Sequence, residues 1–262
     1  MIKLIDIGIN LMHRNFGQDR KEVMENAEKV GVSPLIITGT SETSSRIAAG
    51  YASRFPSKLC STVGVHPHDA KSCNNSTINE LKRIASEKCV VAIGECGLDY
   101  NRDFSPRDVQ RKIFEEQILL AIDLKMPLFL HERDAFHDFY AALKKHRDKI
   151  SNLVVHCFTG SERELDAYID LGCYIGITGW ICDERRGTHL RNLVKKIPLD
   201  KLMIETDAPF LIPRDLNDKP VNGRNEPKFL PHILKAIAKC VNIDSEELAK
   251  ITWDNTVGFF QL

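Results

Sequence analysis

The sequence predicts an α/β fold, a (β/α)8 barrel of the TIM type, and three observations support this prediction. Eight short apolar runs rich in β-branched residues are nearly continuous in hydrophobicity, as strands buried on both faces of a parallel sheet are. Amphipathic stretches separate the runs, as the crossovers between parallel strands require. Eight strand-then-helix units within 262 residues fit a closed barrel better than an open doubly wound sheet.

The eight apolar runs are the expected strands. They cover residues 3–7, 34–38, 59–65, 90–95, 127–131, 153–156, 173–177 and 201–205. Residues 23–30 and 113–124 show the apolar spacing of amphipathic helices. Ser105 and Pro106 precede the second of these stretches, and they are typical of an N-cap followed by proline at the first helical position.

No segment has the composition of a linker, so we expect residues 1–262 to form one barrel domain. Residues 208–228 are rich in proline and polar side chains, which predicts a long loop over one face of the barrel. The sequence lacks a Gly-x-Gly-x-x-Gly motif after its first apolar run, and this disfavours a dinucleotide-binding fold.

The composition limits the kinds of molecule that the protein is expected to bind. The chain has 36 Lys and Arg against 36 Asp and Glu, so nucleic acid can be bound only through a local patch. It shows no signal peptide and no apolar run of membrane length, and we expect no membrane partner. The eight cysteines form no Cys-x-x-Cys pair and are expected to be reduced thiols of a cytoplasmic protein. We expect a monomer.

Ionisable residues follow several of the expected strands. Glu95, His131 and His156 end the fourth, fifth and sixth runs. Asp207 lies just past the eighth run, and the C-terminal ends of barrel strands meet at one rim. Two histidines and a carboxylate commonly hold a divalent cation with open coordination positions. We therefore expect the first three residues to bind a metal ion, with Asp207 as a fourth ligand or as a base.

More ordinary interpretations stand beside this metal site. A lone histidine at a strand end is more often a hydrogen-bonded structural residue than a ligand, so the prediction depends on the joint pattern. Cys96 and Cys157 directly follow two of the expected ligands, but in an extended chain their side chains point away from those ligands. We expect both to be buried, unreactive thiols.

Three segments closely resemble the signatures of the TatD-family metal-dependent deoxyribonucleases. They are GVHPH at 64–68, VAIGECGLD at 91–99 and MIETDAP at 203–209. The resemblance runs from about residue 5 to the C-terminus. It implies a barrel of the metal-dependent hydrolase kind and hydrolysis of DNA phosphodiester bonds in DNA repair or degradation. For the TatD branch it implies a 3′-5′ exonuclease that prefers single-stranded DNA, with RNA as a second substrate class.

Carried over by motif, the family's metal ligands fall on Glu95, His131 and His156, and its acidic residue falls on Asp207. Most of the wider family begins with Asp-Ser-His-x-His, whose histidines help bind a first metal. Here those two positions hold Gly8 and Asn10, a form that the TatD branch shares. We therefore expect one resident metal, with a second recruited by substrate phosphate. The resemblance favours Mg²⁺, and the ligands also suit Mn²⁺ or Zn²⁺.

Four further residues are expected to bind the substrate: His66, His68, Arg185 and Arg186. The histidines could donate to phosphate or protonate the leaving oxygen, or else cap a turn that Pro67 fixes. The arginines could bind backbone phosphates, or else form a solvated charged loop. Two aromatic side chains could stack a terminal base or pack locally, Trp180 and Phe210.

Two other functions stay open at this point. One is hydrolysis of a small ester, lactone or amide on the same barrel, because a fold does not fix a substrate. The other is DNA binding without catalysis, which Gly8 and Asn10 suggest. A binding module predicts that Glu95→Ala leaves the DNA function intact, whereas a nuclease predicts a loss of several powers of ten in rate.

Overall fold

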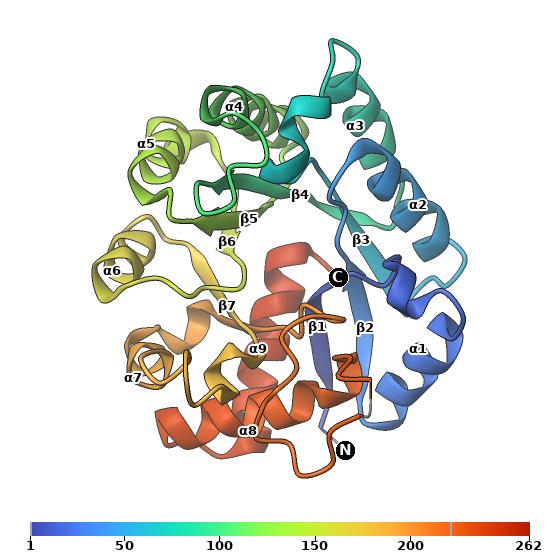
Figure 1. The fold of residues 1–262 in the computed structure, drawn as a ribbon, viewed down its shortest axis with the longest axis vertical. Coiled ribbons are helices and arrows are strands. Elements are labelled where there is room, and N and C mark those ends of the chain that lie inside the picture. Colours follow the sequence, from blue (N-terminus) through green and yellow to red (C-terminus); the bar gives the residue numbers. More distant parts are fainter. Residues whose placement is uncertain (1, 221) are drawn as a thin grey trace.

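The computed structural model describes residues 2–220 and 222–262, in which eight strands form one sheet in chain order (Figure 1). The strands are β1 (Leu4–Ile9), β2 (Val32–Ile37), β3 (Leu59–Val63), β4 (Val90–Asp99), β5 (Leu128–Arg133), β6 (Leu153–Val155), β7 (Tyr174–Ile177) and β8 (Leu202–Ile204). Each strand pairs in parallel with the next. A parallel bridge between Ile9 and Ala208 brings β1 beside the chain after β8, so the barrel is nearly closed.

Helices surround the sheet on its outer side, as parallel crossovers require, and the last of them crosses the N-terminal end of the barrel (Figure 1). They are α1 (Arg20–Lys29), α2 (Glu42–Ala52), α3 (Thr77–Ala85), α4 (Arg107–Leu124), α5 (Phe136–His146), α6 (Glu162–Asp170), α7 (Leu190–Leu193), α8 (Leu230–Val241) and α9 (Ser245–Phe260). Val23, Met24 and Ala27 form the buried face of α1, as expected, but Val30 at the end of the expected stripe is the C-cap residue and is exposed. Within the described residues, no helix is long and apolar enough to cross a membrane.

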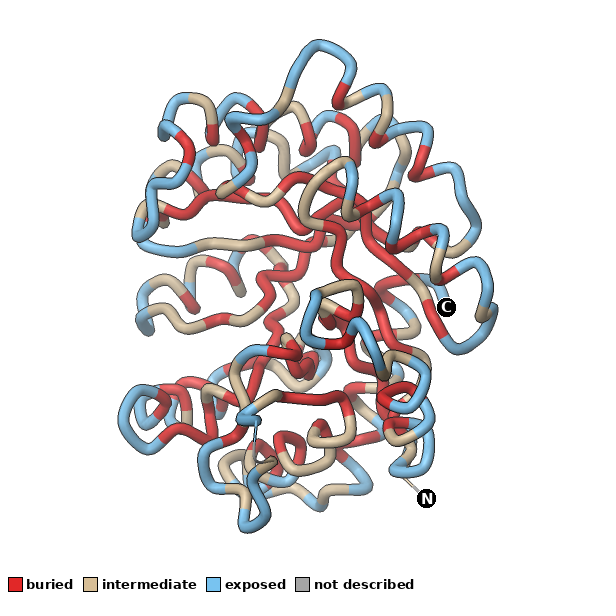
Figure 2. The backbone as a smooth tube through the Cα atoms, turned by 45° about the vertical axis from the view of Figure 1, so that its right-hand side comes forward, coloured by how far each residue is buried: buried red, intermediate tan, exposed pale blue. Residues whose placement is uncertain are grey.

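Apolar side chains pack on both faces of the sheet, because successive residues of a strand point to opposite sides. In β1, Leu4 belongs to the outer cluster under the helices and Ile5 to the inner cluster. The strands are accordingly buried along most of their length (Figure 2). Phe259 and Phe260 of α9 join the inner cluster, and the ring of Phe259 lies 5.0 Å from that of Tyr174 at the start of β7. The N-terminal end of the barrel is therefore filled, which leaves the opposite rim for a site.

All eight expected strands are present, so the predicted fold is confirmed, but β4 and β5 extend past the residues at which they were expected to end. β4 continues past Glu95 to Asp99, and β5 continues past His131 to Arg133. The two strands stay paired there, with Gly97 opposite His131. Glu95 and His131 therefore lie inside strands rather than at their ends.

The start of α4 also differs from the expectation. The helix begins at Arg107, Pro106 is its N-cap residue, and no side chain caps it. The Ser105 hydroxyl instead donates to the carbonyl of His68 at 2.8 Å and accepts from the N–H of Lys71 at 3.0 Å. Ser105 thus fixes the loop that carries an expected substrate-binding histidine.

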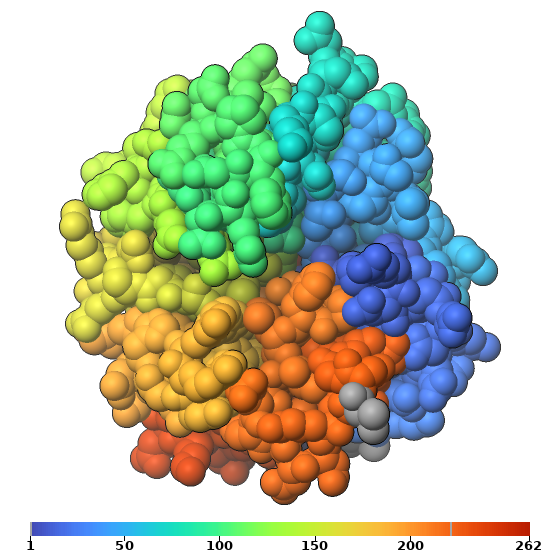
Figure 3. Space-filling model, viewed as in Figure 1, coloured from blue at the N-terminus to red at the C-terminus, as the bar shows by residue number. Residues whose placement is uncertain are grey.

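The long loop expected after β8 is confirmed. Residues 209–220 and 222–226 contain no helix or strand, and a 3₁₀ helix at Pro227–Phe229 ends the loop ahead of α8. On the face shown in Figure 3, this loop (orange) meets the N-terminal segment (dark blue) and the segment before α4 (green) around the centre. Segments far apart in the sequence therefore border one rim of the barrel.

Candidate metal centre

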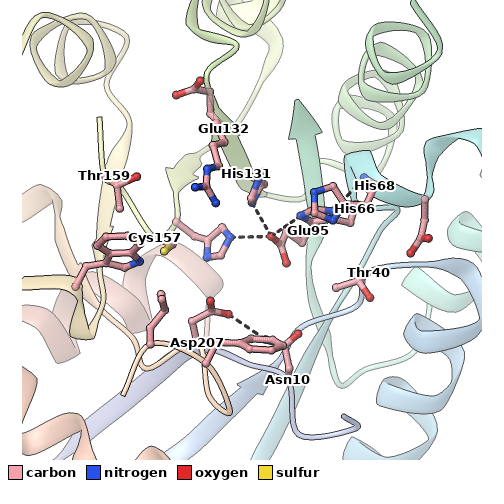
Figure 4. A pocket seen from close by; sticks show the side chains of 16 residues that line it. Asn10, Thr40, His66, His68, Glu95, His131, Glu132, Cys157, Thr159 and Asp207 are labelled. Atoms are coloured by element: carbon pink, nitrogen blue, oxygen red, sulfur yellow. Dashed lines mark hydrogen bonds and ion pairs between the residues drawn. The ribbon is translucent and has the colours of Figure 1, made fainter. Parts of the chain in front are cut away.

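A pocket of about 420 Å³ opens at the C-terminal rim of the strands (Figure 4). Its lining includes Asn10, His66, His68, Glu95, His131, His156, Cys157, Trp180, Asp207 and Phe210. The three expected metal ligands and the expected acid therefore share one cavity with both expected histidines of the loop after β3.

One carboxylate oxygen, Oε1 of Glu95, is the centre of the cluster. It lies 2.8 Å from Nε2 of His156, 3.0 Å from Nδ1 of His131 and 3.3 Å from Nε2 of His66. These contacts converge in Figure 4. Glu95 and His131 come from β4 and β5, while His156 directly follows β6 and His66 follows β3. The structure thus brings the expected ligands together and adds His66 to them.

The buried charges of the cluster shift its pKa values strongly. Burial disfavours the charged carboxylate of Glu95, yet the charge of His156 and the hydrogen bonds from His131 and His156 hold its pKa well below the ordinary value. Burial likewise disfavours a charged His156, yet Glu95 and Glu205 hold its pKa well above the ordinary value. Burial lowers the pKa of His66 to about 4. The negative charge of Glu95 is therefore balanced by positive charge held against it.

The donor set of the cluster fits a divalent cation. The ligand atoms of His66, Glu95 and His131 all lie within 4.8 Å of one another. Nε2 of His131 is buried, and no described residue gives it a hydrogen bond, since the Oδ2 atom of Asp99 is 3.5 Å away. Imidazole nitrogen and carboxylate oxygen are suitable donors for Zn²⁺, Mn²⁺ and related ions. A cation would supply the positive charge that the ring protons otherwise provide.

Glu205 contacts His156 of the cluster, and it was not predicted as a site residue from the sequence. Its side chain is fully buried, with Oε2 at 3.3 Å from Nδ1 of His156 and Oε1 accepting the N–H of Cys157 at 2.5 Å. A Cβ atom on Gly8 would lie 2.6 Å from Oε2, and one on Gly176 would lie 2.6 Å from Oε1. The glycine at position 8 therefore leaves room for this carboxylate. Its place within the final signature, two residues before Asp207, was the available signal.

The loop after β3 is held from two sides. Asp99, also not singled out from the sequence, accepts a 2.7 Å hydrogen bond from Nε2 of His68. The buried amide of Gln117 accepts the N–H of Val65 at 2.7 Å and donates to its carbonyl at 3.0 Å. His66 follows Val65 directly, so α4 positions it through the backbone. Asp99 lies in the same motif as Glu95, which was the signal that could have found it.

Asp207 lies across the pocket from His131 and pairs with Asn10 (Figure 4). The side-chain amide of Asn10 donates to Oδ1 of Asp207 at 2.9 Å. Burial raises the pKa of Asp207 to about 8. Just before it, Thr206 donates its N–H to buried Asp6 at 2.9 Å, and its hydroxyl bonds the same carboxylate. Asp6 within β1 and Asn10 just after it thus fix the position of the acid.

The expectation for Cys157 was wrong in one respect. Its backbone has a φ of +48°, so the chain is not extended there and the side chain lines the pocket. Burial raises its pKa well above the ordinary value, which keeps the thiol protonated. Cys96, by contrast, is fully buried in the core, as expected.

The two expected phosphate-binding arginines differ in their surroundings. Arg185 is held by Asp183, with Nη2 to Oδ2 at 3.1 Å and its N–H to Oδ1 at 2.9 Å. Arg186 makes no such pair among the described residues, and its guanidinium lies 5.7 Å from the ring centre of Trp180. Trp180 lines the pocket, so Arg186 lies beside it.

A family model described as TatD related DNase matches residues 5–261. This chain belongs to that family. The 3′-5′ ssDNA/RNA exonuclease TatD of Pectobacterium parmentieri (strain WPP163) is 48% identical over 259 residues, covering 99% of this chain and 100% of the relative. The protein of the same name from Rahnella sp. (strain Y9602) is 49% identical, covering 99% of this chain and 98% of the relative. The family resemblance expected from the motifs is therefore confirmed.

Solved structures place this TatD-family chain in the same fold. A TatD homologue from Escherichia coli K12 has a TM-score of 0.91 at 25% identity, covering 100% of this chain and 99% of that one. A TatD-family hydrolase from Entamoeba histolytica has a TM-score of 0.88 at 28% identity, covering 98% of both chains. An N-isopropylammelide isopropylaminohydrolase from Burkholderia multivorans, at 13% identity and a TM-score of 0.63, covers 98% of this chain and 75% of its own, and shares the fold alone.

Proposed function

We propose that this protein is a divalent-metal-dependent exonuclease that hydrolyses phosphodiester bonds of single-stranded DNA, and of RNA, from the 3′ end. The observation that carries the proposal is the convergence of His66, His131 and His156 on one oxygen of Glu95 inside an open pocket. Near-half identity over the full length to relatives named 3′-5′ ssDNA/RNA exonuclease supports the substrate class. The chain acts as one barrel domain spanning residues 1–262.

The cation is held by Glu95, His131 and His156. His66 is a further nitrogen ligand, because its Nε2 lies 3.3 Å from Oε1 of Glu95. Mg²⁺ is the functional ion, and Mn²⁺ or Zn²⁺ also suits these donors. A divalent ion supplies positive charge to the phosphodiester and makes a proton of nearby water easier to remove. Asn10 and Gly8 provide no second cluster of nitrogen donors, which supports one resident ion.

Asp207 accepts the proton of the attacking water once the charge of the bound cation offsets the effect of burial on its pKa and ionises the carboxyl. Its carboxyl is buried and faces the cluster across the pocket, and the Asn10 amide fixes Oδ1. The other oxygen is left to meet water. The bonds between Thr206 and Asp6 hold the backbone that aims this side chain.

The substrate backbone contacts two segments, the loop after β3 and the loop after β7. His68 is oriented by Asp99, and it donates to the phosphate or to the leaving oxygen. His66 stays at the cation, because its Nδ1 accepts the N–H of His68 and its Nε2 faces Glu95. Arg186 binds a backbone phosphate, and Arg185 contributes less because Asp183 holds it. A terminal base stacks on one of two pocket aromatics, Trp180 or Phe210.

The test is a cleavage assay on chelated protein resupplied with single metals. Single- and double-stranded oligonucleotides labelled at the 5′ end are incubated with Mg²⁺, Mn²⁺ or Zn²⁺ and resolved on gels. We expect shortening from the 3′ end of single strands, lost by several powers of ten in Glu95→Gln. Glu87→Gln, an exposed carboxylate outside the pocket, is the matched control. Hydrolysis of esters or lactones with intact oligonucleotides would overturn the proposal.

A further inference from the structure

Three metal-binding side chains meet outside the catalytic pocket. They are Cys182, Asp215 and His232, and one ligand atom from each lies within 4.8 Å of the others. Nε2 of His232 is 2.7 Å from Oδ1 of Asp215. Cys182 ends a 3₁₀ helix after β7, Asp215 lies in the loop after β8, and His232 is in the first turn of α8. Three separate segments therefore contribute one donor each.

The three donors match a divalent ion in total charge and in the type of donor atom. Cys182 is only 1% exposed, whereas Asp215 and His232 are partly open to solvent, which gives an ion a path of entry and leaves a position for water. A thiolate and a carboxylate together carry two negative charges, and a neutral imidazole adds none. They would balance a divalent ion, and sulfur, nitrogen and oxygen donors together are typical of zinc.

We propose that Cys182, Asp215 and His232 form a second divalent-cation site, of the zinc type, that pins the loop after β8 against the barrel. This site is separate from the catalytic centre, since none of the three lines the catalytic pocket. It does not depend on the proposed nuclease function.

The loop packs against the barrel through buried Pro213, which lies beside Gly179, but few polar contacts hold it. Residues 211–219 make no backbone–backbone hydrogen bond with any described residue. Apart from the Asp215–His232 contact, its ion pairs are those of Arg214, whose Nε lies 3.7 Å from Glu184 and 3.8 Å from Asp183. A bound ion would add a cross-link where the main chain provides none. Binding energy of this kind is also folding energy for the segment that it orders.

The site lies directly behind one wall of the catalytic pocket. The 3₁₀ helix that ends at Cys182 also carries Trp180, and the loop that contains Asp215 begins with Phe210. Both aromatic residues line the pocket. The cation would therefore fix the spacing of two pocket aromatics without touching the substrate.

A nucleophilic cysteine is the competing interpretation, because cysteine, histidine and aspartate also occur together in hydrolases. Such a cysteine must be exposed to substrate and easily deprotonated. Cys182 is buried, and burial together with the Asp215 carboxylate raises its pKa. Without a cation it stays a thiol, so the arrangement suits a metal rather than a nucleophile.

Cobalt is the probe for the test, because a Co²⁺–thiolate bond gives a charge-transfer band in the near ultraviolet. We expect the band to appear in the whole protein once Co²⁺ is supplied for both the Glu95 cluster and the thiol site, and Zn²⁺ to remove it. The band is lost in Cys182→Ser and shifts to higher cobalt concentration in His232→Ala. It is kept in Cys240→Ser and Cys157→Ser, which remove a neighbouring thiol and the pocket thiol, and in Glu95→Gln.

Absence of the band in the wild-type protein at saturating Co²⁺ would overturn the proposal. So would a band that survives Cys182→Ser, or one that disappears with Cys157→Ser. Should Cys182→Ser fail to fold, His232→Ala decides alone, because the side chain of His232 is 34% exposed and its removal leaves the core intact. An unchanged cobalt titration in that variant contradicts the site.

Discussion

The side-chain amide of Asn10 donates a 2.9 Å hydrogen bond to Oδ1 of Asp207. The two residues come from the end of β1 and from the chain after β8, so they meet only because the barrel closes. The Asn10 amide therefore orients the pocket carboxylate. Residues next to the first and last strands therefore form one part of the proposed active site, the Asn10–Asp207 pair.

Asn10→Ala tests whether the hydrogen bond from Asn10 orients Asp207. Loss of the amide frees Asp207 to rotate, and we expect kcat on a single-stranded oligonucleotide to fall about 10–100-fold, as for other residues that orient an active-site group. KM should change little, because the amide is not expected to touch the substrate. A steady-state titration separates the two constants. A kcat within twofold of wild type contradicts the positioning role.

Gly8→Ala tests the packing of Glu205. The new Cβ atom would lie 2.6 Å from Oε2 of Glu205 and 3.1 Å from the ring of Phe129. We expect unfolding in urea to show a loss of about 1–3 kcal/mol, the usual cost of overpacking a rigid core. Gly50→Ala is the matched control, because nothing lies within 4 Å of its Cβ position in α2. It should stabilise by about 0.5–1 kcal/mol, and equal effects of both changes would refute the account.

Arg186→Ala and Arg185→Ala test the path of the nucleic-acid backbone. Arg186 pairs with no carboxylate of the described residues and lies beside Trp180, whereas Asp183 holds Arg185. We expect Arg186→Ala to weaken binding to single-stranded DNA and to reduce the salt dependence of log K by about 0.7, the value for one phosphate. Arg185→Ala should have the smaller effect. Fluorescence anisotropy at several salt concentrations measures both, and the reverse order would show that the wrong arginine was chosen.

Asp19→Asn tests a pH-dependent contribution to stability. Arg224 holds both oxygens of Asp19 at 2.7 and 3.0 Å, and these hydrogen bonds keep the pKa of Asp19 below its ordinary value of 3.8. A lowered pKa means that the stabilisation is present above about pH 4 and is lost as the pH falls through the folded-state pKa. We expect Asp19→Asn to cost about 1.5–3 kcal/mol at pH 7 and progressively less below pH 4. Urea unfolding at a series of pH values measures the difference, which should not stay constant.

The strands and the rim cluster were predictable because topology leaves few choices. A strand buried on both faces must be apolar throughout, so runs such as 34–38 and 127–131 stand out from the sequence. Once eight of them alternate with helices, their C-terminal ends share one rim, and Glu95, His131 and His156 must come together there. That His66 joins them follows from the same rule.

Other features depend on backbone conformation and side-chain contacts that a pattern does not encode. The positive φ at Cys157 turns its thiol into the pocket, against the alternation of an extended chain. β8 ends at Ile204, so Glu205 leaves the strand pattern and lies under His156. The difference between Arg185 and its neighbour depends on Asp183, which comes close only once the loop folds. The cluster at Cys182 combines segments that no local motif connects.

Titration of chelated protein with Mn²⁺, followed by the electron paramagnetic resonance signal of the free ion, measures whether the Glu95 cluster holds one cation. Mn²⁺ prefers nitrogen and oxygen donors, so it reports the Glu95 cluster rather than the thiol site. We predict one tight equivalent in the wild-type protein and in Glu87→Gln, and none in Glu95→Gln. Equal affinity in Glu95→Gln, two equally tight equivalents in the wild type, or no uptake at saturation would contradict the account.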